Sequence, residues 1–266
     1  MERFGYALED GLNVARRNVI KIIRVPEILV GVLVTPVIMV VMFAYVFGGS
    51  IDVAGSSYRE FLVAGAFALS LVFGATFTGA GLADDMRKGI IDRFKSLPMS
   101  RSAVVFGRTA SDVIYNVLTL VVMAGAGLLV GWRINNGIGN ALLGFGLLLL
   151  FSYAISWVMA YVGLLVPSPE VVANASTMVL FPLTFIANTF VPSDSLPTPL
   201  RVFAEWNPVS AVTQSARELF GNIPPGAPES EAWSLQNPEI YTLIWVGILI
   251  AVFAPLAVGR YRAAKR

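Results

Sequence analysis

The sequence contains neither cysteine nor histidine. Without cysteine there can be no disulfide, no thiolate metal ligand and no cysteine nucleophile. The absence of histidine removes the commonest general base and the commonest metal ligand, and with them a Ser-His-Asp triad. The phosphate-binding pattern G-x-x-x-x-G-K-S/T is also missing, so the chain cannot hold ATP in a P-loop. These absences argue against an enzyme and predict no metal, cofactor or catalytic site on this chain.

Charge is also scarce. Only 14% of the residues are charged, against roughly 25% in ordinary globular domains. Hydrophobic residues make up 56% of the chain, and its mean hydropathy is +0.72. Such a chain has too little polar surface to cover itself in water. We therefore expect an integral membrane protein rather than a soluble protein with a large core of buried helices, and we expect no nucleic-acid partner.

Long stretches with little or no charge alternate with charged ones along all 266 residues. A helix needs about 20 apolar residues to cross a hydrocarbon core of roughly 30 Å, whereas a barrel strand needs only about 10. Only helices and closed barrels satisfy every backbone polar group inside a membrane. The stretches are too long for barrel strands, so they predict an all-α integral membrane protein with a single transmembrane domain, residues 1–266. The six expected spans are 28–49, 61–83, 109–132, 138–166, 171–191 and 240–259.

The distribution of lysine and arginine predicts the orientation of the chain. Most of the 19 basic residues lie before the first span, between the second and third spans, or after the last span. Basic residues accumulate on the cytoplasmic side of a membrane. Both termini and residues 84–101 are therefore expected in the cytoplasm, and residues 192–239, between the fifth and sixth spans, on the extracellular side.

An amphipathic helix is expected before the first span. In residues 1–26, Phe4, Leu8 and Leu12 recur at helical spacing, with basic residues largely on the other side. A basic amphipathic helix beside a span is typical of a segment that lies in the cytoplasmic membrane interface. A surface that binds a partner protein is the alternative.

A second short helix is expected in the extracellular segment, at residues 208–220. Asn207 can cap it, Pro208 suits the first helical position, and Gly221 can end it. The helix either dips into the membrane or packs on the surface of the bundle. A gate at the outer mouth is one hypothesis for its role.

No carboxylate is expected deep in a span. The nearest ones lie at span ends: Glu27, Glu60, Asp112 and Glu170. Asp112 follows Arg108 by one helical turn, so the two are expected to pair on one helix face. Transporters driven by protons or sodium usually carry ionisable groups at membrane depth. If this chain transports a substrate, its energy is therefore expected from elsewhere.

A few polar and aromatic side chains interrupt the apolar spans. Ordinary hydrogen bonding and packing between helices would explain them, and the alternative is a transport pathway. The candidates for lining such a pathway are Asn116, Asn174, Thr177, Phe181, Phe185 and Asn188. Glycines in the spans, among them Gly79 and Gly146, would allow neighbouring helices to approach closely.

The stretch DDMRKGIIDRFKSLPMSR, residues 84–101, places many charges between two apolar spans, and we call it the charged segment. Asp84 and Asp85 can cap the start of a short helix there. An apolar stripe along that helix is expected from Ile90, Ile91 and Phe94. The helix ends before Pro98, because the residue that precedes a proline avoids the helical region. A helix tied between two spans would move both when force is applied to it. A solvated loop at a positive boundary is the alternative.

The same segment carries a resemblance to a known family. The stretch DMRKGIIDRFKSLPMSRSAVVFGR resembles the corresponding part of type-2 ATP-binding-cassette (ABC) exporter permeases, and most closely the daunorubicin/doxorubicin-resistance permease branch of actinobacteria. Further matches follow in the same order along the chain: LLVPSPEVV, FPLTFIANTFVP and AEWNPVSAVTQSARELFGN. The resemblance runs from the first span to Asn222, and the combination of motifs is more specific than any one of them.

This resemblance implies a permease subunit that moves amphipathic drugs or lipid-like substrates out across the bacterial cytoplasmic membrane. In the family, two permease copies, identical or paralogous, form the pathway. Two copies of a separate ATPase subunit bind Mg-ATP beneath them, and the N-terminal helix and the charged segment contact that ATPase. The residues that correspond to this contact are Asp84, Asp85, Arg87, Lys88, Asp92, Arg93, Phe94, Lys95 and Arg101.

Two other functions stay open. An ion-coupled secondary carrier would transport without ATP and would stop when the ion gradient collapses. A membrane assembly protein would bind its partners without transporting anything, and an ATPase subunit would then have no effect on it.

Overall fold

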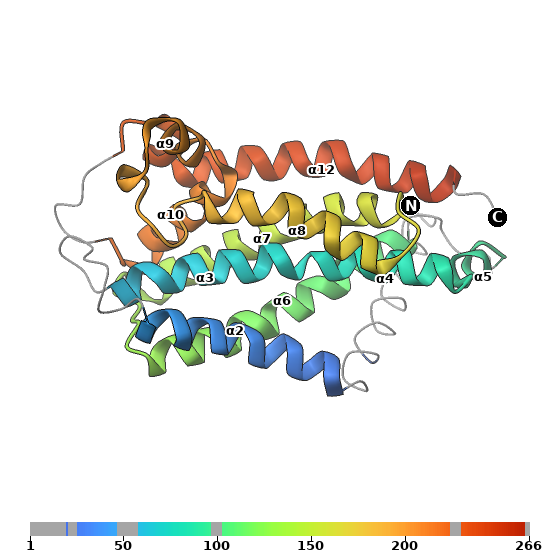
Figure 1. Ribbon diagram of the computed structural model, residues 1–266, viewed down its shortest axis with the longest axis horizontal. Coiled ribbons are helices and arrows are strands. Elements are labelled where there is room, and N and C mark those ends of the chain that lie inside the picture. The colour runs from blue at the N-terminus through green and yellow to red at the C-terminus, as the bar shows by residue number, and fades with distance from the viewer. Residues whose placement is uncertain (1–19, 21–25, 47–57, 97–102, 224–229, 264–266) are drawn as a thin grey trace.

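The computed structural model describes residues 20, 26–46, 58–96, 103–223 and 230–263, and every regular element within these ranges is a helix. Most of the long helices run along the longest axis of the molecule (Figure 1). They are α2 (Pro26–Val46), α3 (Tyr58–Gly74), α4 (Thr76–Arg87), α6 (Ala103–Leu129), α7 (Gly137–Gly163), α8 (Pro169–Phe185) and α12 (Pro238–Ala263). The shorter elements are α5 (Ile90–Ser96), η1 (Ser193–Ser195), α9 (Thr198–Glu205), α10 (Pro208–Phe220) and α11 (Trp233–Gln236).

The short helices mark the two ends of the bundle. α5 lies at one end, and α9 lies at the opposite end (Figure 1). We call these the α5 end and the α9 end. Apart from residues 20 and 26, the expected interfacial helix at 1–26 lies outside the described residues.

Several helices are long and apolar enough to cross a membrane. Within the described residues there are four such stretches: Arg59–Arg87, Val104–Leu129, Gly137–Gly163 and Pro238–Ala263. They correspond to the second, third, fourth and sixth expected spans. The first of them combines α3 and α4, which are separated at Ala75. At the first expected span lies α2, with the shorter apolar stretch Val34–Val46, and at the fifth lies α8, which has 17 residues.

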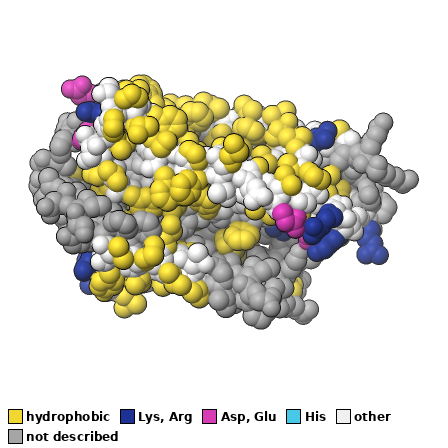
Figure 2. Space-filling model, viewed as in Figure 1, with side chains coloured by type: hydrophobic (Ala, Val, Ile, Leu, Met, Phe, Trp, Pro, Cys, Tyr) yellow, Lys and Arg dark blue, Asp and Glu magenta, His cyan; other side chains and the backbone are white. Residues whose placement is uncertain are grey.

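The surface is apolar between the two ends. Figure 2 shows hydrophobic side chains over much of the described surface of one face, with charged side chains gathered towards the ends. Leu129, Met178 and Ile138 are 88%, 81% and 79% exposed. Exposure of many large apolar side chains is unfavourable in water and natural in lipid. The surface therefore agrees with the membrane protein that the composition predicts.

An aromatic cluster ties α10 to the bundle. It brings together Phe67 from α3, Trp132 after α6, and Phe220 from α10. The Trp132 ring meets Phe67 at 5.4 Å and 89°, and Phe220 at 5.3 Å and 85°. Such edge-to-face pairs each contribute about 0.5–1.5 kcal/mol beyond their burial. The indole Nε1 of Trp132 also donates a hydrogen bond to Asn222 Oδ1 at 2.7 Å, so the cluster contains no unsatisfied indole.

α4 and α7 meet backbone to backbone. A Cβ atom on Gly163 would lie 2.2 Å from the carbonyl oxygen of Gly79, and one on Gly79 would lie 2.6 Å from the carbonyl oxygen of Met159. Neither position has room for any side chain. The close approach expected at Gly79 is thus confirmed, whereas Gly146 faces open space, with no atom of the described residues within 4 Å of an added Cβ.

We expect Gly163→Ala to destabilise the protein, because the new methyl group must push α4 away from α7. Overpacking of a tight contact typically costs about 1–3 kcal/mol. The thermal unfolding temperature in detergent should therefore fall. Gly146→Ala is the matched control on the same helix and should leave the unfolding temperature unchanged or raise it. Equal unfolding temperatures for the two variants would contradict the contact.

Candidate functional site

The charged segment begins inside a helix and not at the start of one. Asp84 and Asp85 lie near the C-terminal end of α4, so their expected role as caps is wrong. α4 continues past the apolar stretch because it packs against α7 and α8, and Asp85 is buried in that contact region. The chain then turns at Gly89, whose φ of 65° favours glycine, and enters α5.

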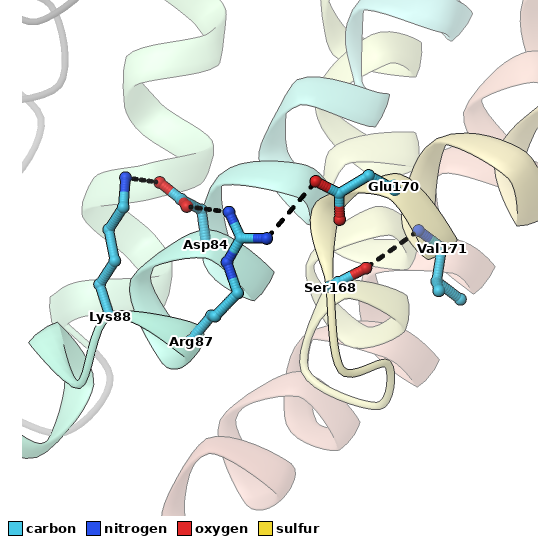
Figure 3. A network of polar contacts seen from close by, with 6 residues as sticks. All are labelled: Asp84, Arg87, Lys88, Ser168, Glu170 and Val171. Carbon is cyan, nitrogen blue, oxygen red and sulfur yellow. Dashed lines mark hydrogen bonds and ion pairs between the residues drawn. The ribbon is translucent and has the colours of Figure 1, made fainter.

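Ion pairs connect the end of α4 to the start of α8 (Figure 3). Lys88 Nζ lies 2.7 Å from Asp84 Oδ2, and Arg87 Nη2 lies 3.2 Å from Asp84 Oδ1. Arg87 also reaches across to α8, where its Nη1 lies 3.4 Å from Glu170 Oε1. Arg87 thus joins the charged segment to the residue directly before the fifth expected span.

The start of α8 is arranged to keep Glu170 charged. The Ser168 hydroxyl accepts a hydrogen bond from the Val171 N–H at 3.4 Å, and Pro169 occupies the first turn (Figure 3). Hydrogen bonding to Ser168 lowers the pKa of Glu170 below its ordinary value, and the charge of Arg87 acts in the same direction. The helix dipole also favours a carboxylate in the first turn. Glu170 is therefore ionised at neutral pH, as the ion pair requires.

α5 has the apolar stripe that the sequence predicts. Ile91 is buried, and together with the partly buried Phe94 it packs against a cluster that contains Trp157 from α7 and Tyr261 from α12. Arg93 lies on the exposed side of α5. The helix is therefore fixed to the bundle by one face and presents charge on the other. The side chains of Asp92 and Lys95, and the whole of Pro98 and Arg101, lie outside the described residues.

The candidate pathway residue Asn116 is buried among helices. Its Nδ2 donates to Ser152 Oγ at 2.7 Å, and that hydroxyl donates to the Leu71 carbonyl oxygen at 3.2 Å. This chain of hydrogen bonds joins α6, α7 and α3. Polar side chains hold membrane helices together in this way, so the position of Asn116 agrees with a packing role.

Asp112 and Arg108 do not pair in the way that their spacing predicts. In the described part of the chain Arg108 makes no ion pair with Asp112, and its Nη2 donates instead to the Phe77 carbonyl oxygen at 2.7 Å. The guanidinium crosses α4 at Gly81, where a Cβ would lie 2.0 Å from Nη2. Asp112 is 6% exposed and lies within the stretch Val104–Leu129. Asp112 is thus a buried carboxylate on a candidate span, and its expected position near a span end stays a prediction.

The other pathway candidates fall into two groups. Asn174, Thr177, Phe181 and Phe185 recur at helical spacing on α8, and all four are exposed. The rings of Phe181 and Phe185 stack with their centroids 4.1 Å apart. Asn188 follows α8 and is buried. The structure thus brings four of the six candidates onto one accessible face.

α10 confirms the local signals of the sequence. Asn207 Oδ1 accepts a hydrogen bond from the Val209 N–H at 2.9 Å, Pro208 begins the helix, and Gly221 ends it with a φ of 72°. Most of its side chains are buried, and it contacts α3, α7, α8 and α12. A helix that lies on the surface of the bundle does not fit this burial, so α10 is inserted into the bundle.

Arg217 on α10 is a buried charged residue whose structural role the sequence does not predict. It is 1% exposed and donates to three backbone carbonyl oxygens, from Nε to Phe61 at 3.0 Å and from Nη2 to Asn188 at 2.8 Å and Thr189 at 3.0 Å. Its guanidinium carbon also lies 3.5 Å from the centroid of the Phe61 ring. Arg217 therefore fastens α10 to the start of α3 and to the segment after α8. The one local signal in the sequence is that Arg217 precedes the apolar Phe220 by about one helical turn, so both side chains lie on the same face of α10.

The sequence of the chain places it in a known family. It belongs to the ABC-2 type transporter family, which matches residues 12–220. It is 31% identical over 237 residues to the daunorubicin resistance ABC transporter permease protein DrrB1 of Streptomyces coeruleorubidus, a match that covers 89% of this chain and 80% of that protein. It is 25% identical, over 88% of this chain and 82% of the other, to the probable doxorubicin resistance ABC transporter permease protein DrrC of Mycobacterium tuberculosis (strain CDC 1551 / Oshkosh). The resemblance inferred from the motifs is confirmed, and the chain is a multi-pass transmembrane permease subunit of an ABC transporter.

We expect Arg217→Met to lower stability, because three buried carbonyl oxygens lose a charged donor. Hydrogen bonds to charged groups contribute about 1.5–3 kcal/mol each, so the unfolding temperature should fall clearly. Arg133→Met is the control, because Arg133 is exposed and water can replace its hydrogen bonds to the Leu128 and Trp132 carbonyl oxygens. It should change the unfolding temperature little. If the two variants were equally stable, Arg217 would not be the anchor of α10.

Proposed function

We propose that this chain is the membrane subunit of an exporter for amphipathic drugs or lipid-like molecules, and that Mg-ATP hydrolysed on a separate ATPase subunit supplies the energy. The names of the relatives, which refer to daunorubicin and doxorubicin resistance, support this substrate class. The observation that carries the mechanism is the ion pair between Arg87 and Glu170, because it joins the charged segment to the exposed face of α8. In this proposal six spans cross the bacterial cytoplasmic membrane, with both termini in the cytoplasm.

The ATPase, in two copies, binds the charged segment at the α5 end. Arg93 is exposed there, while Ile91 is buried in the bundle. Force applied to α5 is therefore transmitted to the helices beneath it and is not absorbed by a loose loop. From α4 the movement passes to α7 through the glycine contact and to α8 through Arg87.

A second permease copy completes the pathway along the exposed face of α8. Asn174 and Thr177 are polar and exposed on α8, where the Thr177 hydroxyl donates to the Ala173 carbonyl oxygen of its own helix at 2.9 Å. Polar side chains that face lipid are costly. A pathway between two copies lets these side chains face water or substrate instead. The stacked rings of Phe181 and Phe185 add apolar surface that suits a flat aromatic drug. The buried Asn116 and Asn188 hold the surrounding helices in place.

α10 acts as the gate at the α9 end of this pathway. Arg217 attaches it to the carbonyl oxygens of Asn188 and Thr189, directly after α8. α8 is thus held by Arg87 at its start and by Arg217 at its end. A shift of α8 caused by the ATPase changes the contacts of α10 and opens the gate.

An ion-coupled carrier is the second candidate function, and Asp112 is the observation that favours it. A carboxylate inside a membrane span is costly and often marks an ion or proton pathway. Asp112 is buried within Val104–Leu129, and its Oδ2 has no hydrogen-bond partner among the described residues. Such a carrier would move its substrate in the absence of ATP.

The exporter proposal predicts that an ABC ATPase subunit copurifies with the tagged chain from its native membrane. Arg93→Ala combined with Phe94→Ala should release that subunit or abolish drug-stimulated ATP hydrolysis, since it removes an exposed charge and an apolar contact of α5. Arg133→Ala combined with Ile138→Ala is the matched control at the other end of the bundle, where both side chains are exposed, and should have no effect. If no ATPase copurifies and the α5 variant behaves as wild type, the carrier or assembly function takes the place of the exporter.

The ion pair predicts a charge-swap result. Glu170→Arg alone should uncouple drug export from ATP hydrolysis, because it repels Arg87, and adding Arg87→Glu should restore part of the coupling. The lowered pKa of Glu170 means that the pair is present at neutral pH and is lost only as the pH falls through that lowered pKa. Transport and ATP hydrolysis by the reconstituted complex provide the measurement. Identical coupling in the single and double variants would show that this contact carries no force.

A further inference from the structure

α9 is amphipathic, but its apolar side chains point outward and its polar side faces the bundle, the reverse of a surface helix on a soluble protein. On the polar side Glu205 is buried, and its Oε1 accepts a hydrogen bond from Arg201 Nε at 2.8 Å. Ala204, on the same side, is fully buried. The side chains on the outer side are apolar, and each is 42–52% exposed: Leu200, Val202, Phe203 and Trp206.

Aromatic side chains continue this outer surface onto α12. The ring of Tyr241 lies 6.1 Å from that of Trp206, 6.2 Å from that of Trp233 and 6.4 Å from that of Trp245. The Tyr241 hydroxyl donates to the Trp206 carbonyl oxygen at 2.8 Å, which fixes the end of α9 against the start of α12. α12 is itself a candidate span, and it exposes a row of large apolar side chains: Ile240, Leu243, Ile244 and Ile248.

We propose that α9 and the aromatic cluster of Trp206, Trp233, Tyr241 and Trp245 form a membrane anchor that lies among the phospholipids, at the boundary between headgroups and hydrocarbon. Exposure of the apolar side of α9 to water would be unfavourable by about 25 cal/mol for each Å². Tryptophan and tyrosine favour this boundary because their rings are apolar at one end and polar at the other.

The exposed apolar surface of α9 is continuous with that of α12, which indicates that lipid covers both. The exposed face of a membrane span is covered by hydrocarbon, and the α9 surface joins that face through Trp206 and Tyr241. An amphipathic helix beside a span lies in the plane of the interface with its apolar face inward to the lipid. The ion pairs of Arg201 with Asp194 and Glu205 satisfy the polar side, so that no charge needs to enter the hydrocarbon.

The anchor also sets the position of α10. Trp206 is followed directly by Asn207, which caps α10 and donates from Nδ2 to the Leu183 carbonyl oxygen of α8 at 2.6 Å. A helix held at the lipid boundary therefore fixes the start of α10 and the end of α8 at one level in the membrane. The anchor does not depend on which substrate the protein transports.

Spin labelling tests the anchor, and the absence of cysteine allows single-cysteine variants of the full chain. A nitroxide is attached at Phe203→Cys, on the outer side of α9, and in a control at the exposed Ser195→Cys in η1. The protein is reconstituted in vesicles of phosphatidylethanolamine and phosphatidylglycerol. Collisions of the label with oxygen, which concentrates in hydrocarbon, and with a water-soluble nickel chelate are then measured by electron paramagnetic resonance.

The anchor predicts a loss of nickel collisions and a gain of oxygen collisions at position 203 relative to position 195. Equal access of the nickel chelate to both labels would overturn the proposal, because α9 would then face water. Protection of label 203 from both reagents, with spin–spin broadening between copies, would also overturn it, because the α9 surface would then be covered by a second copy of the chain.

Discussion

The backbone contact between α4 and α7 is the constraint on which the rest of the structure depends. Gly79 and Gly163 leave no side chain between the two helices, so α4 cannot slide or tilt without moving α7. α7 in turn contacts α6, α10 and α12. Because α4 ends in the charged segment, this one contact connects the most polar part of the chain rigidly to the membrane bundle.

α8 is held at both ends by arginine, and the two contacts differ in kind. At its start Arg87 forms an exposed ion pair with Glu170, which can break and re-form at little cost. At its end Arg217 is buried and bonded to backbone carbonyl oxygens, so its release is expensive. In the proposed mechanism, the weak contact lies at the end of α8 nearest the ATPase and the strong contact lies at the proposed gate, so that α8 can transmit movement from one to the other. Its exposed face, with Phe181 and Phe185, lies between the two.

The sequence predicted the elements whose signals are local. Apolar length predicted the four described helical stretches that are long enough to cross a membrane. Asn207, Pro208 and Gly221 defined α10, because caps and turns depend on neighbouring residues. Asp84 and Asp85 were misjudged as caps because packing against α7 and α8 extends α4 beyond its apolar stretch. The Arg108–Asp112 pair was misjudged for a similar reason, since Gly81 opens a route for the guanidinium across α4. The role of Arg217 depends on carbonyl groups far away in the sequence, and no local pattern contains them.

In the proposed function, ATP hydrolysed on a partner subunit drives this permease. The most direct test is drug uptake into inside-out vesicles that contain this chain and its ATPase, with a fluorescent anthracycline as substrate. Uptake should require hydrolysable ATP and should continue after ionophores have collapsed the proton and sodium gradients. Uptake that proceeds without ATP and stops when those gradients collapse would contradict the exporter function. It would favour an ion-coupled carrier in which the buried Asp112 takes part.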